Sequence, residues 1–346
     1  MTDQIAEVLR QYGLPVHGYQ VERTGSGHIN FTYLVKGPST FILQRINTNV
    51  FRQPELIASN LREAADFLAQ HAPDYLFLAA IRTTSGEEMA FDDQGQPWRL
   101  FPYIPDTITL DKVDTVEQAF EAAKGFGALT RKLDGIDVSR FRPTIPGFQD
   151  LGWRAQQLDQ ALAGTTAERK LQAAEAIRQA HEFRFLVDHY QTFTGSGRLK
   201  NRVVHNDTKI NNILFNEHSQ KAVCVIDLDT LMPGYFIYDL GDMVRTFVSP
   251  VSEEEKDISR IAFRNDFYQA LLDGYMSEMK DCLLPQEQAA IPFAGMMMTY
   301  IMAIRFLADF LNGNVYYQIH YPEQNLVRAT NQLKLVRCIG EALKYS

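Results

Sequence analysis

The first hundred residues alternate apolar and polar positions in short runs, which is the periodicity of half-buried β-strands. Residues 18–47 read GYQVERTGSGHINFTYLVKGPSTFILQRIN, in which a glycine-bearing turn and a Gly-Pro turn separate three such runs. This pattern predicts three antiparallel strands. Strand-like runs with Ser-Gly and Gln-Gly turns return between residues 75 and 104.

A helical period lies between these strand-rich stretches. In residues 54–72, PELIASNLREAADFLAQHA, the apolar residues Leu56, Leu61, Ala64 and Leu68 fall near one face of a helix. The first part of the chain is therefore predicted to be a small antiparallel sheet with one helix. We delimit it as an N-terminal lobe of residues 1–104.

The remainder of the chain is predominantly helical. Residues 114–135, residues 153–193 and most segments after residue 253 are amphipathic with helical spacing. A polar loop around residue 207 and a short strand at residues 222–226 interrupt them. We expect an α+β fold of two lobes, in which the second, mostly helical lobe spans residues 105–346 and contains the polar loop.

Composition and charge narrow the class of protein. Of the 346 residues, 45% are hydrophobic and 22% are charged, and the net charge of −8 offers no attraction to nucleic acid or to an anionic membrane. The N-terminus carries acids and lacks the apolar core of a signal peptide. The most apolar segment, residues 291–311, contains Arg305 and Asp309, which a membrane span rarely keeps. We therefore expect a cytoplasmic protein without a nucleic-acid or membrane partner.

The polar loop carries the candidate chemistry. Residues 203–215 read VVHNDTKINNILF, so Asp207, Lys209 and Asn212 lie between two apolar runs. The strand that follows leads into IDLD, which would bring Asp227 opposite Asn212 across a hairpin. Carboxylate and amide oxygens bind Mg²⁺ together with substrate phosphates, and Asp207 is placed to accept a proton from an attacking hydroxyl. These are the parts that phosphoryl transfer requires.

The order H-x-D-x-x-x-x-N followed by I-D-x-D resembles the aminoglycoside phosphotransferase and choline kinase superfamily, a branch of the protein-kinase-like fold. The resemblance implies a bilobal kinase that uses ATP and Mg²⁺. It makes Asp207 the catalytic base, and it makes Asn212 and Asp227 the metal ligands. It also implies that Lys209 contacts the γ-phosphate and that His205 holds the turn of the loop.

Two further acids follow the metal strand. Asp229 holds the second acidic position of the resembled pattern, where it would assist the metal or meet the substrate. Asp239, in YDLGD, is expected either to accept hydrogen bonds from backbone N–H groups of the catalytic loop or to cap the N-terminus of a helix.

The nucleotide side is predicted from a glycine-bearing turn and a strand. Gly25, Ser26 and Gly27 begin GSGHINFTY, where free backbone N–H groups can bind phosphate oxygens, although a plain hairpin turn has the same composition. The superfamily needs a cation on the third strand, and FILQRIN offers Arg45, with Gln44 on the opposite face. The sequence leaves open which of the two faces the nucleotide.

The rest of the predicted nucleotide site comes from the helix and the last strand of the first lobe. An acidic partner for the third-strand cation is expected in the helix of residues 54–72, where Glu63 is the first candidate and Glu55 the second. Residues 98–104, WRLFPYI, would form the last strand and the linker whose backbone meets adenine.

The resemblance extends to the acceptor side. HNDTKINNILF, VCVIDLDTLMPG and RFLADFLNGNVYYQIHYPEQNLVRATNQLKLV together are similar to the bacterial N-acetylhexosamine 1-kinases. This subgroup implies phosphorylation of the anomeric hydroxyl of N-acetylglucosamine or N-acetylgalactosamine, with Asp229, Arg305 and Tyr317 contacting the sugar. Asp309 lies four residues after Arg305, so an ion pair that merely fixes the helix is the alternative.

Two other functions remain open from the sequence. One is a kinase of the same fold for another small hydroxyl substrate, such as an amino alcohol, homoserine or an aminoglycoside. Few acids accompany Arg305 between residues 291 and 331, which favours a neutral acceptor over a cationic one. The other is a non-catalytic nucleotide-binding protein, which the presence of Asp207, Asn212 and Asp227 disfavours.

Overall fold

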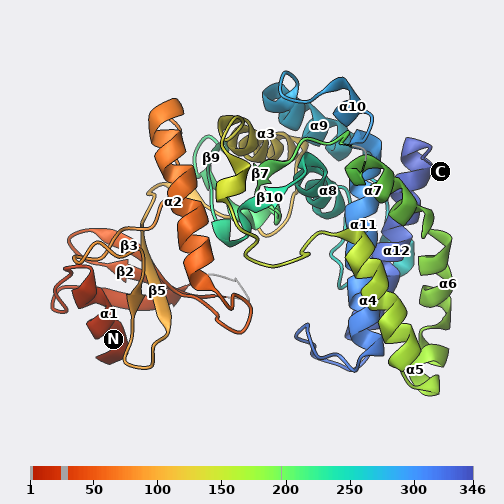
Figure 1. Ribbon diagram of the computed structural model, residues 1–346, viewed down its shortest axis with the longest axis horizontal. Coiled ribbons are helices and arrows are strands. Elements are labelled where there is room, and N and C mark those ends of the chain that lie inside the picture. The colour runs from red at the N-terminus through yellow and green to blue at the C-terminus, as the bar shows by residue number, and fades with distance from the viewer. Residues whose placement is uncertain (1–2, 25–29, 196, 346) are drawn as a thin grey trace.

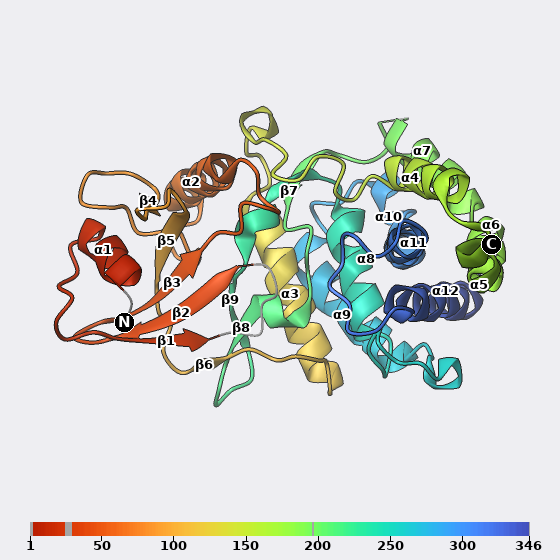
Figure 2. The same ribbon diagram turned by 90° about the horizontal axis from the view of Figure 1, so that it is seen from below.

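The computed structural model describes residues 3–24, 30–195 and 197–345. A small sheet with helices α1 and α2 lies at one end of the long axis, and a larger helical part lies at the other (Figure 1). The short strands β7 to β10 lie between the two, as the perpendicular view also shows (Figure 2). The predicted α+β class, with an antiparallel N-terminal sheet and a largely helical C-terminal part, is confirmed.

The N-terminal sheet has five antiparallel strands in the order β1-β2-β3-β5-β4. Their bounds are β1 Gln20–Thr24, β2 Phe31–Lys36, β3 Thr40–Arg45, β4 Ala90–Phe91 and β5 Pro97–Pro102. The first three are the strands predicted from the alternation in residues 18–47. Gln44 of β3 lies opposite Arg99 of β5, and Arg45 lies opposite Trp98, so these two pairs project to opposite faces of the sheet.

Helix α1 (Asp3–Gln11) covers one face of this sheet and is an addition to the single helix expected in the lobe. Its Val8 and Leu9 are fully buried in one cluster with Leu43 and Trp98. Burial of each aliphatic side chain contributes about 1.5–3 kcal/mol relative to exposure. Because α1 has nine residues, its stability depends on this packing more than on its own hydrogen bonds.

Helix α2 (Pro54–His71) corresponds to the helix predicted for residues 54–72. Three of the four residues expected on its apolar face are buried, but Leu56 is partly exposed and Ile57 takes its place. The buried side chains of α2 belong to the core of the C-terminal part rather than to that of the sheet. This helix therefore packs onto the part of the chain that carries the catalytic loop.

Two small sheets form the junction. Strand β6 (Thr107–Ile108) pairs with β8 (Ile213–Asn216), which pairs with β9 (Ala222–Val225). Strand β7 (Arg202–Val204) pairs with β10 (Met232–Gly234). The predicted lobe boundary at residues 104/105 lies in the connection between β5 and β6, and the strand predicted for residues 222–226 is β9.

Long helices build the C-terminal part. Their bounds are α3 Val116–Lys132, α4 Leu151–Gly164, α5 Ala167–Gln172, α6 Ala174–Glu182, α7 Phe185–Gly195, α8 Phe236–Phe247, α9 Asn265–Met279, α10 Pro285–Gln288, α11 Ile291–Leu311 and α12 Gln324–Leu343. The helical stretch predicted for residues 153–193 is divided among α4 to α7. Thr166 begins α5 because its hydroxyl accepts the backbone N–H of Arg169 at 3.3 Å.

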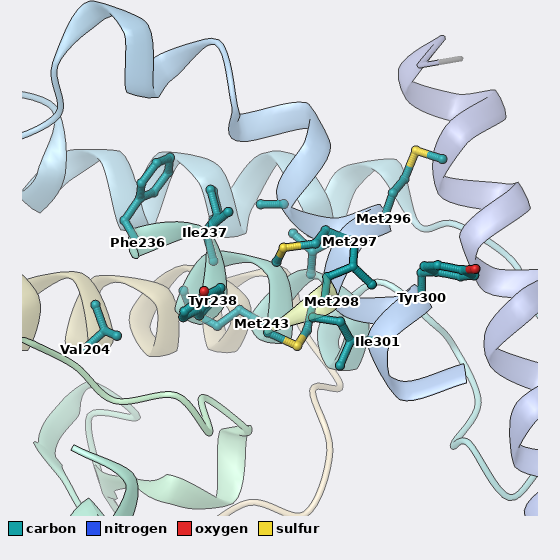
Figure 3. Packing of buried hydrophobic residues seen from close by; sticks show 14 of the residues in the cluster. Val204, Phe236, Ile237, Tyr238, Met243, Met296, Met297, Met298, Tyr300 and Ile301 are labelled. Carbon is teal, nitrogen blue, oxygen red and sulfur yellow. The ribbon is translucent and has the colours of Figure 1, made fainter. Parts of the chain in front are cut away.

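Helix α11 lies at the centre of this core. Its Met297, Met298 and Ile301 pack in one cluster with Ile237 and Met243 of α8 (Figure 3). The helix is long and apolar enough to cross a membrane by length and composition, but 78% of its most apolar window is buried inside the protein. Its apolar character is therefore explained by the surrounding helices.

Two glycines let α8 and α11 approach closely. A Cβ on Gly241 would collide with the carbonyl oxygen of Ala294, and a Cβ on Gly295 would collide with the side chain of Val244. Each helix contributes one of these glycines, so their axes lie closer than larger side chains would permit. The spacing matters to the site because α8 also carries Asp239.

Candidate active site

A cavity of about 390 Å³ lies between the five-stranded sheet and the β8–β9 hairpin. Gln44 and Arg99 line it from the sheet, Tyr103 lines it from the connection between the sheets, and Asn212 and Asp227 line it from the other side. The two predicted metal ligands are thus brought to one cavity. The backbone N–H of Ile226 also donates to the carbonyl of Asn212 at 2.9 Å, which fixes the two loops side by side.

Asp207 is half-buried and contacts Asn212 of this second wall without lining the cavity itself. Its carboxylate pairs with the Lys209 ammonium at 3.0 Å and accepts the Asn212 side-chain N–H at 3.2 Å. Burial raises the pKa of Asp207, but the nearby Lys209 outweighs burial and holds the pKa below the ordinary value. The same pairing raises the pKa of Lys209. Asp207 is therefore ionised at neutral pH, as a proton acceptor must be.

His205 connects the catalytic loop to the metal strand. Its Nδ1 accepts the backbone N–H of Asp207 at 3.2 Å, and its Nε2 lies 2.9 Å from the carbonyl oxygen of Ile226. These partners fix the tautomer with the proton on Nε2. The imidazole is fully buried and meets the edge of Phe126. A fully buried ring with both nitrogens engaged has the structural role that the resemblance implies.

Asp239 of α8 is hydrogen-bonded to the backbone of the catalytic loop. Its carboxylate accepts the backbone N–H groups of His205 at 3.0 Å and Asn206 at 2.7 Å. Its own carbonyl accepts the Thr208 hydroxyl at 2.7 Å. The expected contact with the loop backbone is confirmed, whereas Tyr235 and not Asp239 stands at the helix N-cap. Burial raises the pKa of Asp239 to about 6, against the lowering effect of its donors.

Asp227 follows β9 in a left-handed conformation, with φ of 56°. Protein atoms around the cavity and the neighbouring carboxylates of Asp229 and Asp207 raise the pKa of Asp227 to about 6, even though its side chain reaches solvent. Carboxylates that repel one another in this way favour a cation between them. The side-chain N–H₂ of Asn212 donates to Asp207, which leaves its oxygen as the group available to a metal.

These donors fit a hard divalent cation that shares its coordination with a substrate. In the described ranges 3–24, 30–195 and 197–345, no group of three or more His, Cys, Asp or Glu side chains is placed to hold a metal ion. Mg²⁺ characteristically takes one or two protein carboxylates and completes its shell with phosphates and water. Asn212 and Asp227 would hold Mg²⁺ in that manner.

Asn211 is a cavity residue that the sequence prediction did not single out. Its side chain lines the cavity next to Asn212, and its Oδ1 is buried without a hydrogen-bond partner in the structure. The doubled Asn-Asn of KINNILF is the sequence signal that points to it.

The predicted phosphate-binding residues are placed differently from one another. Gly25, Ser26 and Gly27 lie outside the described residues. Arg45 points away from the cavity, because its guanidinium lies over the ring of Phe31 at 4.2 Å, on the face opposite to Gln44. The cation that lines the cavity among the described residues is Arg99 of β5. The candidate cation of β3, Arg45, therefore does not line the cavity in this structure, whereas Arg99 of β5 does.

The expected acidic helix partner is also placed elsewhere. Glu63 of α2 pairs with Arg140 at 2.7 Å, and Glu55 is exposed. Arg99 instead forms an ion pair with Asp229, with NH2 and Oδ1 2.5 Å apart. Neither glutamate meets a cavity cation, so both candidates for that role are wrong in this structure.

Asp229 is buried away from an acceptor. Besides the ion pair with Arg99, its Oδ2 accepts the side-chain N–H of Asn30 at 2.7 Å, and 2% of the residue is exposed. Both carboxylate oxygens are thus held by residues of the N-terminal part. The predicted contact of Asp229 with a sugar is not available in this arrangement.

Arg305 and Tyr317 do lie together. The Arg305 guanidinium lies over the rings of Tyr317 at 5.6 Å and Phe148 at 5.3 Å. Among the described side chains no carboxylate forms an ion pair with Arg305. The buried hydroxyl of Tyr317 lacks a hydrogen-bond partner in the structure, and burial raises its pKa.

Asp309 does not form the alternative ion pair with Arg305. Its carboxylate accepts the backbone N–H groups of Val315 at 2.9 Å, Tyr316 at 2.8 Å and Tyr317 at 3.0 Å. The side chain of Asn325 donates to it as well, at 2.8 Å. Asp309 therefore orders the loop that carries Tyr317, and among the described residues Arg305 has a hydrogen bond to the Met302 sulfur at 3.4 Å but no ion pair.

The segment between α3 and α4, where the sequence shows no motif, supplies further contacts. The buried side chain of Gln149 donates to the carbonyl of Asn206 at 2.9 Å, next to the catalytic base. Arg154 donates to the carbonyl of Phe148 at 2.9 Å. Burial, and then repulsion from Arg305, lower the pKa of Arg154 to about 10. Two guanidinium groups therefore share one region beside the catalytic loop.

Comparison with known proteins agrees with this geometry. The sequence profile of the phosphotransferase enzyme family matches residues 20–279. A microcompartment-associated aminopropanol kinase superposes with a TM-score of 0.61 at 16% identity, covering 98% of this chain and 97% of that one. Spectinomycin phosphotransferase in complex with ADP and spectinomycin gives 0.60 at 14% identity, covering 100% and 99%.

A choline/ethanolamine kinase family protein from Mesorhizobium loti gives a TM-score of 0.61 at 16% identity, covering 99% of this chain and 96% of that one. At such identities the solved structures show a shared fold, which is the one that the resemblance implies. The sequence profile matches most of the chain, including the catalytic loop, the metal strand and Asp239. The chain belongs to the phosphotransferase enzyme family.

Proposed function

We propose that this phosphotransferase moves the γ-phosphoryl group of ATP to the anomeric hydroxyl of an N-acetylhexosamine. The observation that carries the acceptor class is the unpaired Arg305 beside the free hydroxyl of Tyr317. A guanidinium and a phenol hydroxyl offer hydrogen-bond donors to a carbonyl or hydroxyl oxygen of a neutral ligand. The similarity of residues 305–336 to N-acetylhexosamine 1-kinases supports the same acceptor.

The charges around Arg305 argue against a cationic acceptor. Arg154 and Arg305 repel each other, so a third positive charge beside them would be disfavoured. The nearby acids are already engaged, because Asp309 binds backbone N–H groups and Glu253 pairs with Arg245 at 2.8 Å. An amino alcohol or an aminoglycoside would need free carboxylates at its ammonium groups. Aminopropanol and spectinomycin, which appear in the names of two proteins of similar fold, are therefore less suited to this site than a neutral sugar.

In the proposed reaction the ionised Asp207 accepts the proton of the anomeric hydroxyl. The sugar oxygen forms a bond to the γ-phosphorus, the bond from that phosphorus to the β,γ-bridging oxygen breaks, and ADP leaves with the electron pair. Mg²⁺, held by Asn212 and Asp227 with the phosphates, would neutralise phosphate charge. Lys209 keeps Asp207 ionised before the reaction and lies close enough to meet negative charge on the transferred group.

The test is an acceptor panel assayed by ADP release with ATP and Mg²⁺. N-acetylglucosamine and N-acetylgalactosamine are expected to support turnover. Glucosamine carries an ammonium in place of the acetamide on the same ring, so it tests whether the site disfavours a positively charged acceptor. The 1-deoxy analogue of N-acetylglucosamine tests the position, because it lacks the anomeric hydroxyl and should give no product. ADP release with ethanolamine or aminopropanol, and none with either acetylated sugar, would reject the proposal.

A further inference from the structure

We propose that Arg99 of β5 is the residue that binds the nucleotide phosphates, in the place that a third-strand cation would take. The inference rests on the proposed function only in requiring that a nucleoside phosphate enters the cavity. It makes no use of the acceptor's identity. Nothing in the local sequence around Arg99 indicates this role, because the role follows from strand pairing.

The register of the sheet directs Arg99 into the cavity. Gln44 and Arg99 are directly opposite in the antiparallel pair of β3 and β5, so both side chains project to the same face. Arg45 and Trp98 are the next opposite pair, on the other face. There Arg45 lies against aromatic rings. A side chain at position 45 therefore projects away from the cavity, whereas one at position 99 projects into it.

The guanidinium of Arg99 is held in a fixed orientation. Its Nε and NH2 donate to the Gln44 side-chain oxygen at 3.1 and 2.9 Å, and Gln44 in turn donates to the Thr32 hydroxyl at 3.1 Å. The residue is 3% exposed, and its NH1 is buried without a hydrogen-bond partner among the residues that the structure describes. A buried donor left without an acceptor is unfavourable. A phosphate oxygen is a charged acceptor that matches this planar group.

Arg99 is also the one positive charge among the described residues that line the cavity. Its companions there include the oxygen donors Asn211, Asn212 and Asp227. A nucleoside di- or triphosphate carries several negative charges, and the oxygen donors would bind it only through a metal. Among the side chains that line the cavity, direct attraction to the phosphates therefore has to come from Arg99.

Asp229 balances this charge when no nucleotide is bound. A buried arginine needs a counter-charge, and the ion pair with Asp229 at 2.5 Å supplies it. Phosphate oxygens would then compete with the Asp229 carboxylate for the same guanidinium. Because Asn30 also holds Asp229, the carboxylate keeps one partner when Arg99 turns to the phosphate.

The experiment compares the binding of ADP and adenosine by calorimetry, without divalent cation, in the wild type, Arg99→Met and Arg45→Met. Adenosine lacks the phosphates and reports the rest of the nucleotide site. Loss of a charge-assisted hydrogen bond corresponds to a weakening of about tenfold to a hundredfold. We expect Arg99→Met to weaken ADP by that factor and to leave adenosine within about twofold by the same reasoning. Arg45→Met is expected to retain both affinities.

A folded Arg99→Met protein with the wild-type ratio of ADP to adenosine affinity would overturn the proposal. If that variant does not fold, a crystal structure of the wild-type protein with ADP decides instead. Arg99 is expected within hydrogen-bonding distance of a phosphate oxygen. An Arg99 still paired with Asp229 and remote from the phosphates would overturn it equally. Neither measurement involves a sugar, so failure of the N-acetylhexosamine assignment would be recognised separately.

Discussion

The carboxylate of Asp239 accepts the backbone N–H of Asn206 at 2.7 Å, and through this bond helix α8 fixes the turn that precedes Asp207, the predicted catalytic base. Asn206 has a φ of 69°, in the left-handed region that non-glycine residues seldom adopt. Its side chain also donates to the carbonyls of Val204 and Thr230, at 3.1 and 3.0 Å. The direction of the Asp207 side chain thus depends on a buried network.

Asp239→Asn should loosen this network. The amide has one acceptor oxygen for two buried N–H groups, so one donor loses its partner, at a cost of about 1–3 kcal/mol in the free energy of unfolding. Turnover should fall as the loop shifts, while ADP affinity is retained. Urea unfolding and steady-state kinetics measure the two effects. Asp257→Asn is the control, because Asp257 accepts the Ser259 N–H in the same way on the surface, and an equal loss there would remove the special role of Asp239.

Asp207→Asn removes the proton acceptor and preserves the shape of the side chain. General base catalysis contributes about 10²–10⁴-fold, so turnover should fall by at least the lower of these factors. ADP affinity, measured by calorimetry, should remain, because Asp207 is not among the described residues that line the nucleotide cavity. Turnover close to that of the wild type would contradict the role of base.

Arg99 and Asp229 should show strong coupling in a double-mutant cycle. Removing one partner leaves the other buried and unpaired, which costs about 3–5 kcal/mol, whereas removing both leaves no isolated charge. The unfolding free energies of Arg99→Met, Asp229→Asn and the double variant should therefore be clearly non-additive. Additive losses would mean that the 2.5 Å contact carries little net energy.

Arg305→Met tests the acceptor site. Arg305 has aromatic neighbours and no ion pair among the described side chains, so its loss should alter stability little. The KM of the acceptor should rise by about tenfold or more, as for the loss of a hydrogen bond from a charged donor, while the KM of ATP stays constant. Arg337→Met, which removes a surface pair with Glu182, is the matched control. An unchanged acceptor KM in Arg305→Met would exclude a contact with the acceptor.

Asp92 should make the stability of the N-terminal sheet depend on pH. Its carboxylate accepts the Trp98 indole N–H at 2.8 Å, the Gln4 side chain at 2.6 Å and the Gln96 backbone N–H at 2.8 Å. Burial raises the pKa of Asp92, but these donors outweigh burial and lower the pKa below its ordinary value. Its contribution is therefore present above the unfolded-state pKa of about 4 and is lost as the pH falls through the lower folded value.

Asp92→Asn should accordingly reduce the unfolding free energy at pH 7 by about 1–3 kcal/mol. The difference from the wild type should shrink as the pH falls below about 4. Urea titrations from pH 7 to pH 3 measure it. A difference that stays constant over this range would show that ionisation of Asp92 does not contribute.

Local sequence was sufficient for the catalytic loop. His205, Asp207 and Asn212 lie within one short motif, and the turn that joins them permits few geometries. Asp239 was predictable because its motif follows the metal strand closely along the chain. Which cation lines the cavity depends instead on the pairing of β3 with β5, more than fifty residues apart, which no local pattern specifies.

The spacing of Asp309 left open an alternative that the structure does not show. An i, i+4 separation permits an ion pair with Arg305, and the sequence contains no sign of the competing donors. In the structure the chain turns back after α11 and presents three backbone N–H groups to Asp309. Those donors occupy both carboxylate oxygens. Helix α1 was missed although the sequence carries its signal, because Ile5, Val8 and Leu9 fall on one face of a helix and are buried against the sheet.

The glycines at the crossing of α8 and α11 give the catalytic loop a distant point of control. Gly241 stands two residues after Asp239 and faces Ala294, while Gly295 faces Val244, and a methyl group fits at neither glycine. A change in the distance between α8 and α11 would shift Asp239, which lies less than one helical turn from Gly241 and binds the loop before Asp207. A substitution at either glycine would therefore alter both the packing of the core and the position of Asp239, although neither glycine lines the cavity.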